Sequence, residues 1–477
     1  MNAWTEPTPS AAVDRVLTAL APRFGERLTV NRSIREIHAS GEGFHTARPP
    51  HAVAFPLSTE EVALAVTACG DHGVPVIPFG AGTSLEGGVT APLGGLCLDL
   101  SRMDAITAVN AADLDCTVQA GVTREALNAH LRDTGLFFPI DPGANATLGG
   151  MCATRASGTT AVRYGTMRDN VLSLEVVLAD GTVIRTGTRA RKSAAGYDLT
   201  RLFLGSEGTL GIITSVTLKL YGRPEAEAAA VCAFDTLRGA VDCVIDVLQL
   251  GVPVARIELM DATQVRACNA YSGTTLAETP TLLFEFHGSD TAVREQAETV
   301  GELIASHGGS DFAWAAGLED RNALWKARHA AYHAAQALRP GTSLLVTDVC
   351  VPISRLADCI LETHADIAAA GLVAPIVGHV GDGNFHVMFP VNPENEAEIE
   401  QVHVLNDRLV DRALAMEGTC TGEHGVGIGK REKLVKELGP RAVGAMAAIK
   451  AAMDPAGILN PGKIFIPELA PPLPVLT

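Results

Sequence analysis

The sequence predicts an α+β protein whose two halves are built differently. In the first half, glycine-rich loops follow short apolar strands, and such loops allow the backbone of an α/β segment to approach a phosphate. In the second half, apolar strands alternate with long helices, which is typical of an antiparallel sheet with helices packed on one side. The segment Tyr221–Glu225 separates the two patterns.

Each element of this scheme has its own signal. A helix is expected at about 10–27, and another begins at Ser58, where Glu61 can complete a capping box. Asp180-Gly181 between two apolar runs predicts a hairpin. The strands expected in the second half lie at about 229–234, 254–259, 281–287, 344–351, 374–378 and 385–391. The helices expected there lie at about 236–250, 290–306, 318–337, 353–369 and 394–416, and two short helices follow residue 430.

The composition excludes several classes of protein. Among 477 residues, 37 Lys and Arg stand against 54 Asp and Glu, and the net charge of −17 argues against a nucleic-acid partner. Ten cysteines without a C-x-x-C pair indicate reduced, mostly buried thiols and a cytoplasmic protein. The sequence shows no targeting signal and no apolar run long enough to span a bilayer, so we expect at most peripheral membrane contact.

Three glycine-rich stretches in the first half suit a large phosphate-bearing ligand. The first, Pro78–Gly88, combines four glycines with the hydroxyls of Thr83 and Ser84, and successive bare N–H groups can hold a pyrophosphate. The second runs from Asp141 to Ala153, and the third is Leu204–Ile213. An ordinary tight turn could explain one of these stretches, but three together favour backbone wrapped around a cofactor.

The second half carries a cluster of ionisable residues. His379 and His386 lie on either side of a Gly-Asp-Gly-Asn turn, so a hairpin would bring them together. Glu423 and His424 lie in a second glycine-rich loop. Two imidazoles and a carboxylate make an open catalytic site for a divalent cation. A metal-dependent hydrolase without a flavin would use the same cluster and is one alternative.

A helix at about 324–332 supplies a candidate for binding an anion. Arg328 and Tyr332 are four residues apart and therefore share a face. An arginine can bind a carboxylate through two hydrogen bonds. The alternative is a solvated arginine on the surface.

These motifs, with the closing segment Asp454–Lys463, resemble the FAD-linked D-2-hydroxyacid dehydrogenases of the vanillyl alcohol oxidase superfamily, from about residue 45 to 467. Arg339–Gly341 and Thr347–Leu356 are most similar to the cytochrome-linked D-lactate dehydrogenase branch, and glycolate oxidase is a near relative. The resemblance implies an FAD-binding domain that begins in residues 1–225, a substrate or cap domain with the metal site in residues 226–430, and a segment 431–477 that returns to the FAD domain.

The resemblance also implies site residues. FAD, bound non-covalently, would contact residues from all three glycine-rich stretches and the closing segment: Pro78, Gly80, Ala81, Gly82, Thr83, Ser84, Gly87, Gly88, Pro142, Gly143, Thr147, Gly149, Gly150, Ser157, Glu207, Gly208, Ile213 and Asn460. One metal ion (Zn, Mn or Fe) would bind His379, His386 and Glu423. His424 would be the catalytic base, and Arg328, with Tyr332 one turn further on, would bind the substrate carboxylate.

The implied reaction is oxidation of a small D-2-hydroxy acid, above all D-lactate, to the 2-oxo acid, with hydride transfer to the flavin. Val346 and Met388 stand where relatives acting on 2-hydroxyglutarate carry Lys and Asn, which favours a monocarboxylic substrate. Glycolate, longer D-2-hydroxy acids, and a non-catalytic flavin-binding subunit of a glycolate oxidase-like complex remain alternatives. The expected electron acceptor is a cytochrome, a quinone or an electron-transfer flavoprotein, and a homodimer is left open.

Overall fold

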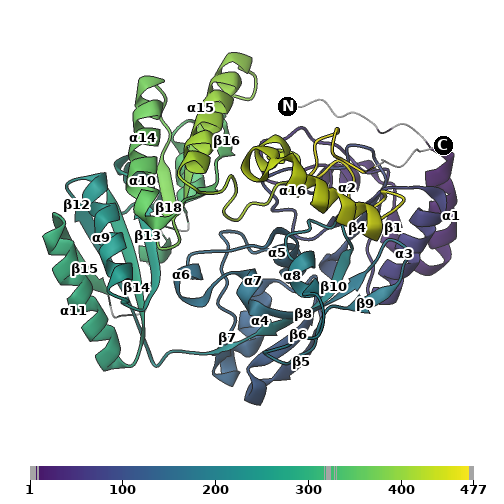
Figure 1. The fold of residues 1–477 in the computed structure, drawn as a ribbon, viewed down its shortest axis with the longest axis horizontal. Helices are drawn as coiled ribbons and strands as arrows, with labels where there is room; N and C mark the ends of the chain where they lie inside the picture. Colours follow the sequence, from purple (N-terminus) through teal and green to yellow (C-terminus); the bar gives the residue numbers. More distant parts are fainter. Residues whose placement is uncertain are drawn as a thin grey trace. The chain divides into compact units, whose positions relative to one another are not determined.

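The computed structural model describes residues 7, 10–315, 317, 324–326, 328 and 330–471. They form two compact units (Figure 1). The sheet unit contains Gly158–Gly165 and Arg223–Gly422, and the loop unit contains Asn2–Ser157, Thr166–Gly222 and Glu423–Thr477. The predicted domain limits at residues 225 and 430 stay a prediction. Part of the predicted helix at 318–337 lies outside the described residues.

The loop unit combines three sheets with several helices. Its helices are α1 (Ala11–Phe24), α2 (Arg32–Ile37), α3 (Thr59–His72), α4 (Arg124–Leu131), α5 (Leu148–Thr154), α7 (Met167–Asn170), α8 (Leu199–Phe203) and α16 (Arg431–Met453). Its strands are β1 (Leu28–Thr29), β2 (Ala52–Ala54), β3 (Val76–Phe79), β4 (Leu96–Asp99), β5 (Ile106–Asn110), β6 (Asp115–Gln119), β7 (Leu136–Phe137), β8 (Val171–Val177), β9 (Val183–Arg185), β10 (Ile212–Lys219) and β11 (Tyr221–Gly222).

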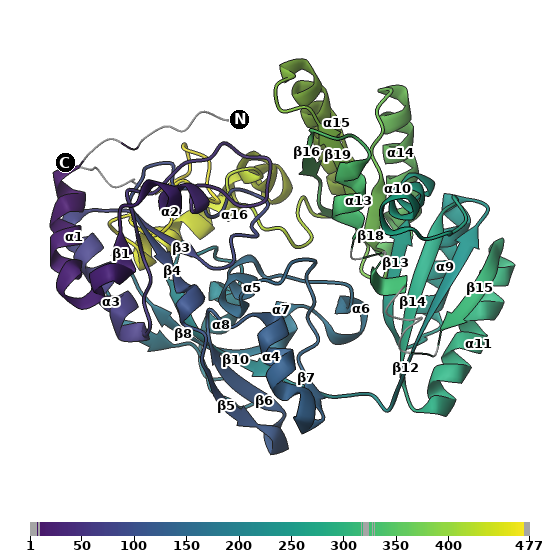
Figure 2. The same ribbon diagram turned by 180° about the vertical axis from the view of Figure 1, so that it is seen from behind.

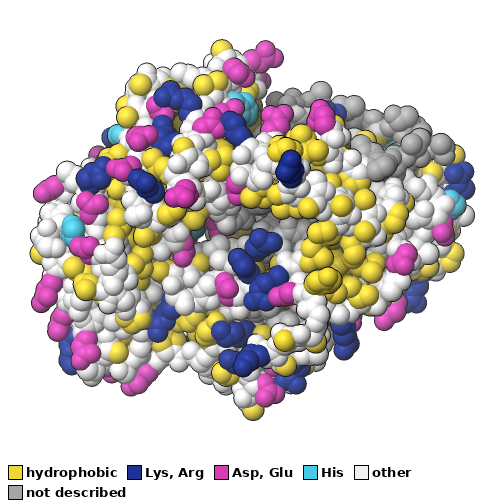
Figure 3. Space-filling view, in the orientation of Figure 1, with side chains coloured by type: hydrophobic (Ala, Val, Ile, Leu, Met, Phe, Trp, Pro, Cys, Tyr) yellow, Lys and Arg dark blue, Asp and Glu magenta, His cyan; other side chains and the backbone are white. Residues whose placement is uncertain are grey.

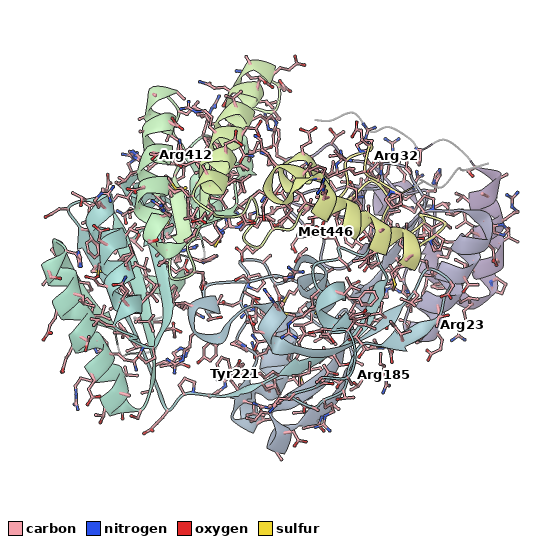
Figure 4. The ribbon with its side chains drawn as sticks, in the orientation of Figure 1. Arg23, Arg32, Arg185, Tyr221, Arg412 and Met446 are labelled. Carbon is pink, nitrogen blue, oxygen red and sulfur yellow. The ribbon has the colours of Figure 1, made fainter. Side chains whose placement is uncertain are left out.

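The two larger sheets of the loop unit differ in strand direction, and the third sheet is the antiparallel pair of β7 and β11. The order β1-β2-β4-β3 includes two parallel pairs, β2 with β4 and β3 with β4, whereas the order β5-β6-β10-β8-β9 is antiparallel throughout. The predicted hairpin at Asp180-Gly181 is confirmed, since Val177 pairs with Val183 and Gly181 adopts a φ of +82°. Tyr221, labelled in Figure 4, follows β10 and donates a 2.9 Å hydrogen bond to the Asn170 side chain.

Two helix predictions in the loop unit need refinement. Ser58 caps α3 by accepting a hydrogen bond from the Glu61 N–H at 3.4 Å, as predicted. The Glu61 carboxylate, however, accepts from the Leu57 N–H and binds Arg27, because a nearby guanidinium attracts it away from the Ser58 backbone. The two helices expected after residue 430 are the halves of α16, which meet at Gly439 with a φ of +76°.

The sheet unit contains an eight-stranded antiparallel sheet in the order β15-β12-β14-β13-β18-β19-β16, with β17 also paired to β19 (Figure 2). Its strands are β12 (Ala226–Phe234), β13 (Val254–Met260), β14 (Thr281–Gly288), β15 (Gly309–Ala315), β16 (Ser343–Val346), β17 (Val349–Cys350), β18 (Ile376–His379) and β19 (Asn384–Val391). Its helices include α6 (Ala161–Tyr164), α9 (Leu237–Gln249), α10 (Ala262–Ser272), α11 (Asp290–Ser306), α13 (Ala331–Ala337), α14 (Leu356–Ala369) and α15 (Glu396–Ala415). The sequence patterns missed α10 and β15.

Helices cover parts of both faces of this sheet, so the expectation of helices on one side is wrong. Val231 of β12 and Val377 of β18 pack in one apolar cluster with Ala267 of α10 and Ala334 of α13. Cys232, the next residue along β12, points to the opposite face, and α9 and α11 also contact β12. The antiparallel arrangement itself is confirmed.

Ion pairs join the long helices α14 and α15. Arg412 of α15, labelled in Figure 4, donates hydrogen bonds to Glu362 at 2.8 Å and to Asp366 at 2.5 Å, both on α14.

In the loop unit, an apolar stretch of α16 lies at the surface, where Met446 and Ile449 are more than a third exposed (Figure 3). Within the described part of the chain, no helix combines the length and apolar character of a bilayer span.

Candidate active site

The hairpin of β18 and β19 brings the two predicted histidine ligands together. Val377 pairs with His386 and His379 pairs with Asn384, and Gly383 takes the turn at a φ of +79°. The centroids of the His379 and His386 rings are 5.6 Å apart. The convergence of the two histidines across the turn is therefore confirmed.

Hydrogen bonds fix the tautomer of both histidines. His386 Nδ1 lies 2.9 Å from the Thr347 carbonyl oxygen, and His379 Nδ1 lies 2.7 Å from a Glu258 carboxylate oxygen. Since both partners accept, each Nδ1 donates a proton, and the neutral ring of each histidine would present the Nε2 lone pair to a cation, as in metal-binding histidines held by a carboxylate or carbonyl. The candidate ligand nitrogens lie within 4.8 Å of one another, close to the span of two metal–nitrogen bonds of about 2 Å each. The pair fits a divalent cation.

Glu258 of β13 is a site residue that the sequence reasoning missed. Its side chain is fully buried and also binds Arg328, with 2.5 Å between Nη2 and the second carboxylate oxygen. Burial alone would raise the pKa of the Glu258 carboxyl, but His379 and Arg328 together bring that pKa below its usual value. A lone glutamate within an apolar strand gives little signal in sequence, because its two partners come from residues far along the chain.

Arg328 is not the solvated surface arginine of the alternative interpretation. It is 8% exposed, and its ion pair with Glu258 links it to the histidine hairpin. Tyr332 is the second residue of α13, and its ring lies edge-on to the His333 ring at 5.5 Å. The substrate-binding roles of Arg328 and Tyr332 stay predictions.

The chain leading to Glu423 is anchored beside the hairpin. Thr421 donates a 2.9 Å hydrogen bond to Asp348, and Asn384 donates a 2.8 Å bond to the same carboxylate. A side chain on Gly422 would place its Cβ 2.1 Å from the Asn384 amide nitrogen, so only glycine fits there. Glu423, the third predicted ligand, follows Gly422 directly and is the first residue of the loop unit's last segment.

His424 lies in the loop unit near a buried carboxylate from the first glycine-rich stretch. Its Nδ1 is 4.0 Å from Glu86, and Glu86 pairs with Lys430 at 3.2 Å. The Glu86 carbonyl accepts a 2.7 Å hydrogen bond from Ile428, which holds the loop that carries His424. Burial would raise the pKa of the Glu86 carboxyl, but Lys430, His45 and His424 lower it below its usual value.

The three predicted cofactor stretches converge within the loop unit. A Cβ on Gly80 would lie 2.3 Å from Thr147 Oγ1, and a Cβ on Gly208 would lie 2.3 Å from Pro78 Cγ. Gly143, in contrast, has nothing within 4 Å of where its Cβ would be, which leaves room beside the second stretch. Close approach of bare backbone from three segments is the arrangement that a pyrophosphate needs, so these residues fit FAD.

The remaining predicted FAD contacts belong to the same loops, and their roles stay predictions. The Asn460 amide donates to the carbonyls of Gly88 at 3.0 Å and Glu207 at 2.7 Å, so the closing segment holds two of the glycine-rich stretches. Ser157 is the last residue before the chain enters the sheet unit at Gly158.

The sequence reasoning missed a strap formed by residues 41–45, which packs on the first glycine-rich stretch. A Cβ on Gly41 would lie 2.1 Å from the Ser84 carbonyl oxygen, and one on Gly43 would lie 1.8 Å from that of Leu85. The Gly-Glu-Gly sequence was the available signal, but glycines in a polar segment also occur in ordinary turns.

This combination of fold and cofactor loops defines an FAD-dependent oxidoreductase. The family model described as "FAD linked oxidases, C-terminal domain" matches residues 223–464, and "FAD binding domain" matches residues 50–187. The structure resembles 4-ethylphenol oxidase from Gulosibacter chungangensis with a TM-score of 0.80 at 20% identity, over 98% of this chain and 99% of that one. The chain belongs to the FAD-linked oxidase family.

Two relatives place the chain within that family. It is 53% identical over 460 residues to "Probable D-lactate dehydrogenase, mitochondrial" of Danio rerio, covering 96% of this chain and 93% of the relative. It is 47% identical over 446 residues to "D-lactate dehydrogenase [cytochrome], mitochondrial" of Arabidopsis thaliana, covering 93% of this chain and 79% of the relative. Within the family, the chain groups with the FAD-linked D-lactate dehydrogenases.

The same relatives overturn the expected cytoplasmic location. Both are named mitochondrial. The expectation relied on reduced cysteines, and nine of the ten are indeed buried free thiols. Burial protects a thiol in any compartment, so this pattern does not distinguish the cytoplasm from another reducing compartment.

Proposed function

We propose that this chain oxidises D-lactate to pyruvate with FAD as the electron acceptor in the active site and a divalent cation bound by His379, His386 and Glu423. The observation that carries the metal site is the hairpin that fixes both histidines with Nδ1 protonated and Nε2 available for coordination. The two relatives named D-lactate dehydrogenase support the substrate.

The size of the substrate is supported by an apolar cross-strand pair. Val346 of β16 and Met388 of β19 are directly paired, and both belong to the apolar cluster that also contains Trp325. A second carboxylate placed against this pair would lose its hydration without gaining a partner, which is costly. The methyl group of lactate carries no such penalty.

The roles of the protein groups follow from their chemistry. Arg328 offers five N–H donors in a planar fork, so a guanidinium that already binds Glu258 retains donors for the substrate carboxylate. His424 accepts the proton of the C2 hydroxyl as general base. Glu258 holds the His379 ring in the tautomer that coordinates a cation.

The proposed cation and FAD would supply the chemistry that the side chains cannot. A divalent cation at the two histidines would act as a Lewis acid that lowers the pKa of the substrate hydroxyl. The glycine-rich stretches would hold FAD, which would supply an acceptor for the two electrons and the C2 hydride that lactate loses, while His424 would take the hydroxyl proton. The name of the Arabidopsis relative supports a cytochrome as the final electron acceptor.

The test is a dye-reduction assay on the purified flavoprotein with D-lactate, L-lactate, glycolate and D-2-hydroxyglutarate. We expect turnover with D-lactate, at least tenfold slower turnover with the others, and loss of turnover after chelation that an added divalent cation restores. His424→Ala should retain bound flavin and lose turnover by about 10²–10⁴-fold. Equal rates with all four acids would contradict the substrate, and unchanged activity after complete metal removal would contradict the metal site.

A further inference from the structure

Glu207 has a backbone conformation that a residue with a side chain seldom adopts. Its φ is +50°, and it lies between Gly205 at +82° and Gly208 at +71° in the third glycine-rich stretch. The left-handed conformation brings a Cβ close to the following carbonyl oxygen, so it is less favourable for a residue with a side chain than for glycine. Strain of this kind persists where the surroundings hold the residue in place, and it is common at functional sites.

The Glu207 side chain points to the loop that begins with Glu423 and His424. One carboxylate oxygen accepts the Val426 N–H at 2.7 Å, and the other accepts the Gly427 N–H at 2.9 Å. The residue is 6% exposed, and a Cβ on Gly425 would lie 3.0 Å from its carboxylate. Two consecutive backbone amides of the loop are therefore fixed by one side chain.

The Glu207 backbone connects to other segments that we assign to the cofactor. Its N–H donates to the Ala153 carbonyl at 2.9 Å, at the end of the second glycine-rich stretch. Its carbonyl accepts from Asn460 at 2.7 Å, and the same Asn460 amide holds Gly88 of the first stretch. All of these residues lie in the loop unit.

The electrostatic environment shows that this carboxylate is costly to bury. Burial raises the pKa of Glu207 to about 7, although the Val426 and Gly427 amides lower it, and Glu86 raises it further. A glycine would form the same turn without either the strain or the desolvation. The side chain must therefore contribute something that the turn itself does not need.

We propose that Glu207 is a positioning residue that couples the FAD-binding loops to the loop carrying Glu423 and His424, an inference that rests on the proposed function for the roles of those two residues. Ordering of the glycine-rich stretches around FAD holds the Glu207 backbone, and its carboxylate then holds the amides of residues 426 and 427. The general base and the third metal ligand are thereby held in place by the same segments that would bind the cofactor.

The test compares Glu207→Gly, which keeps the turn and removes the anchor, with Asp115→Asn, which alters a buried carboxylate on β6 that pairs with Arg189. The first readout is hydrogen exchange in the FAD-loaded protein. In Glu207→Gly we expect the amides of residues 426 and 427 to exchange at least tenfold faster, with flavin still bound, whereas Asp115→Asn leaves them at the wild-type rate. In the wild type, removal of FAD should accelerate the same amides.

The second readout is D-lactate turnover. Glu207→Gly should lower kcat by about tenfold or more, because a misplaced catalytic group loses the advantage of orientation. Asp115→Asn should keep the wild-type kcat. Wild-type exchange and wild-type kcat in Glu207→Gly would overturn the proposal. If the wild type does not turn over D-lactate, the substrate assignment fails, but the exchange experiment still decides whether Glu207 couples the loops.

Discussion

At the scale of single residues, two carboxylates in the sheet unit form a natural pair for comparison. Glu258 joins His379 to Arg328, and Glu285 joins His287 to Arg256, with 2.7 Å to the histidine in each case. Both carboxylates are buried, and their strands β13 and β14 are neighbours. Only Glu258 contacts a predicted metal ligand.

Glu258→Gln should therefore lower the metal affinity by about 10–100-fold, since the second partner of a ligating histidine sets its orientation and basicity. Loss of the buried charge also leaves Arg328 without its counter-ion, so we expect a lower melting temperature. Glu285→Gln should show a similar loss of stability with wild-type metal content, measured by elemental analysis after dialysis. Equal metal loss in both variants would assign the effect to general destabilisation.

The Glu207 carboxyl also predicts a pH dependence of stability. Its pKa is raised to about 7 in the folded protein, so between its ordinary value and pH 7 the folded state binds the proton more tightly than the unfolded state. The free energy of unfolding should then fall as pH rises across this window, by at most about 3 kcal/mol from this group. Glu207→Gln should make the dependence weaker. Urea unfolding at about pH 5 and pH 7 tests this, and an unchanged slope in the variant would contradict it.

At the scale of elements, the β18–β19 turn decides whether the histidines meet. Gly383 has a φ of +79°, and a Cβ there would lie 2.1 Å from the Val351 carbonyl oxygen. Gly371, after α14, has a similar φ of +68° but nothing within 4 Å. Alanine substitutions at these two glycines therefore distinguish the cost of a positive φ, which both share, from the cost of steric crowding, which only Gly383 has.

Gly383→Ala should distort the hairpin and lower the metal content sharply, whereas Gly371→Ala should cost only about 1 kcal/mol of stability and keep the metal. Metal analysis and thermal unfolding measure the two effects. Full metal occupancy in Gly383→Ala would show that the hairpin geometry is not what positions the ligands.

At the same scale, the sequence was informative where an element carries its own signal. The Gly-Asp-Gly-Asn turn predicted the hairpin, and the Asp180-Gly181 pair predicted another. The sequence did not predict β15 and α10, because their polar and apolar residues form no clear period. It also did not predict that the Glu61 carboxylate would bind Arg27. Partners distant in sequence cannot be inferred from local spacing.

At the scale of the whole molecule, the two proposed ligands belong mainly to different units. The predicted FAD contacts lie in the loop unit, while His379 and His386 lie in the sheet unit. A ligand that binds only the folded state stabilises it, by about 2.7 kcal/mol at a hundredfold excess over its dissociation constant.

Removal of FAD should therefore lower the protection of loop-unit amides such as those of residues 80–88, and chelation should lower that of β18 and β19. Hydrogen exchange with each ligand removed separately measures both effects. Loss of protection in the sheet unit alone on removing FAD would contradict the cofactor assignment.

The α+β class, the three glycine-rich stretches and the meeting of the two histidines could be predicted from the sequence, because glycines at a turn and alternating apolar residues act through local geometry. The tertiary structure decided which groups hold those residues in place: Glu258 behind His379, Glu86 and Glu207 under the loop of His424, and the strap at residues 41–45. These contacts join segments as far apart as Glu86 and Ile428, which are 342 residues from one another in the sequence. Burial makes such polar partners necessary, and only the folded chain determines which partner each buried group finds.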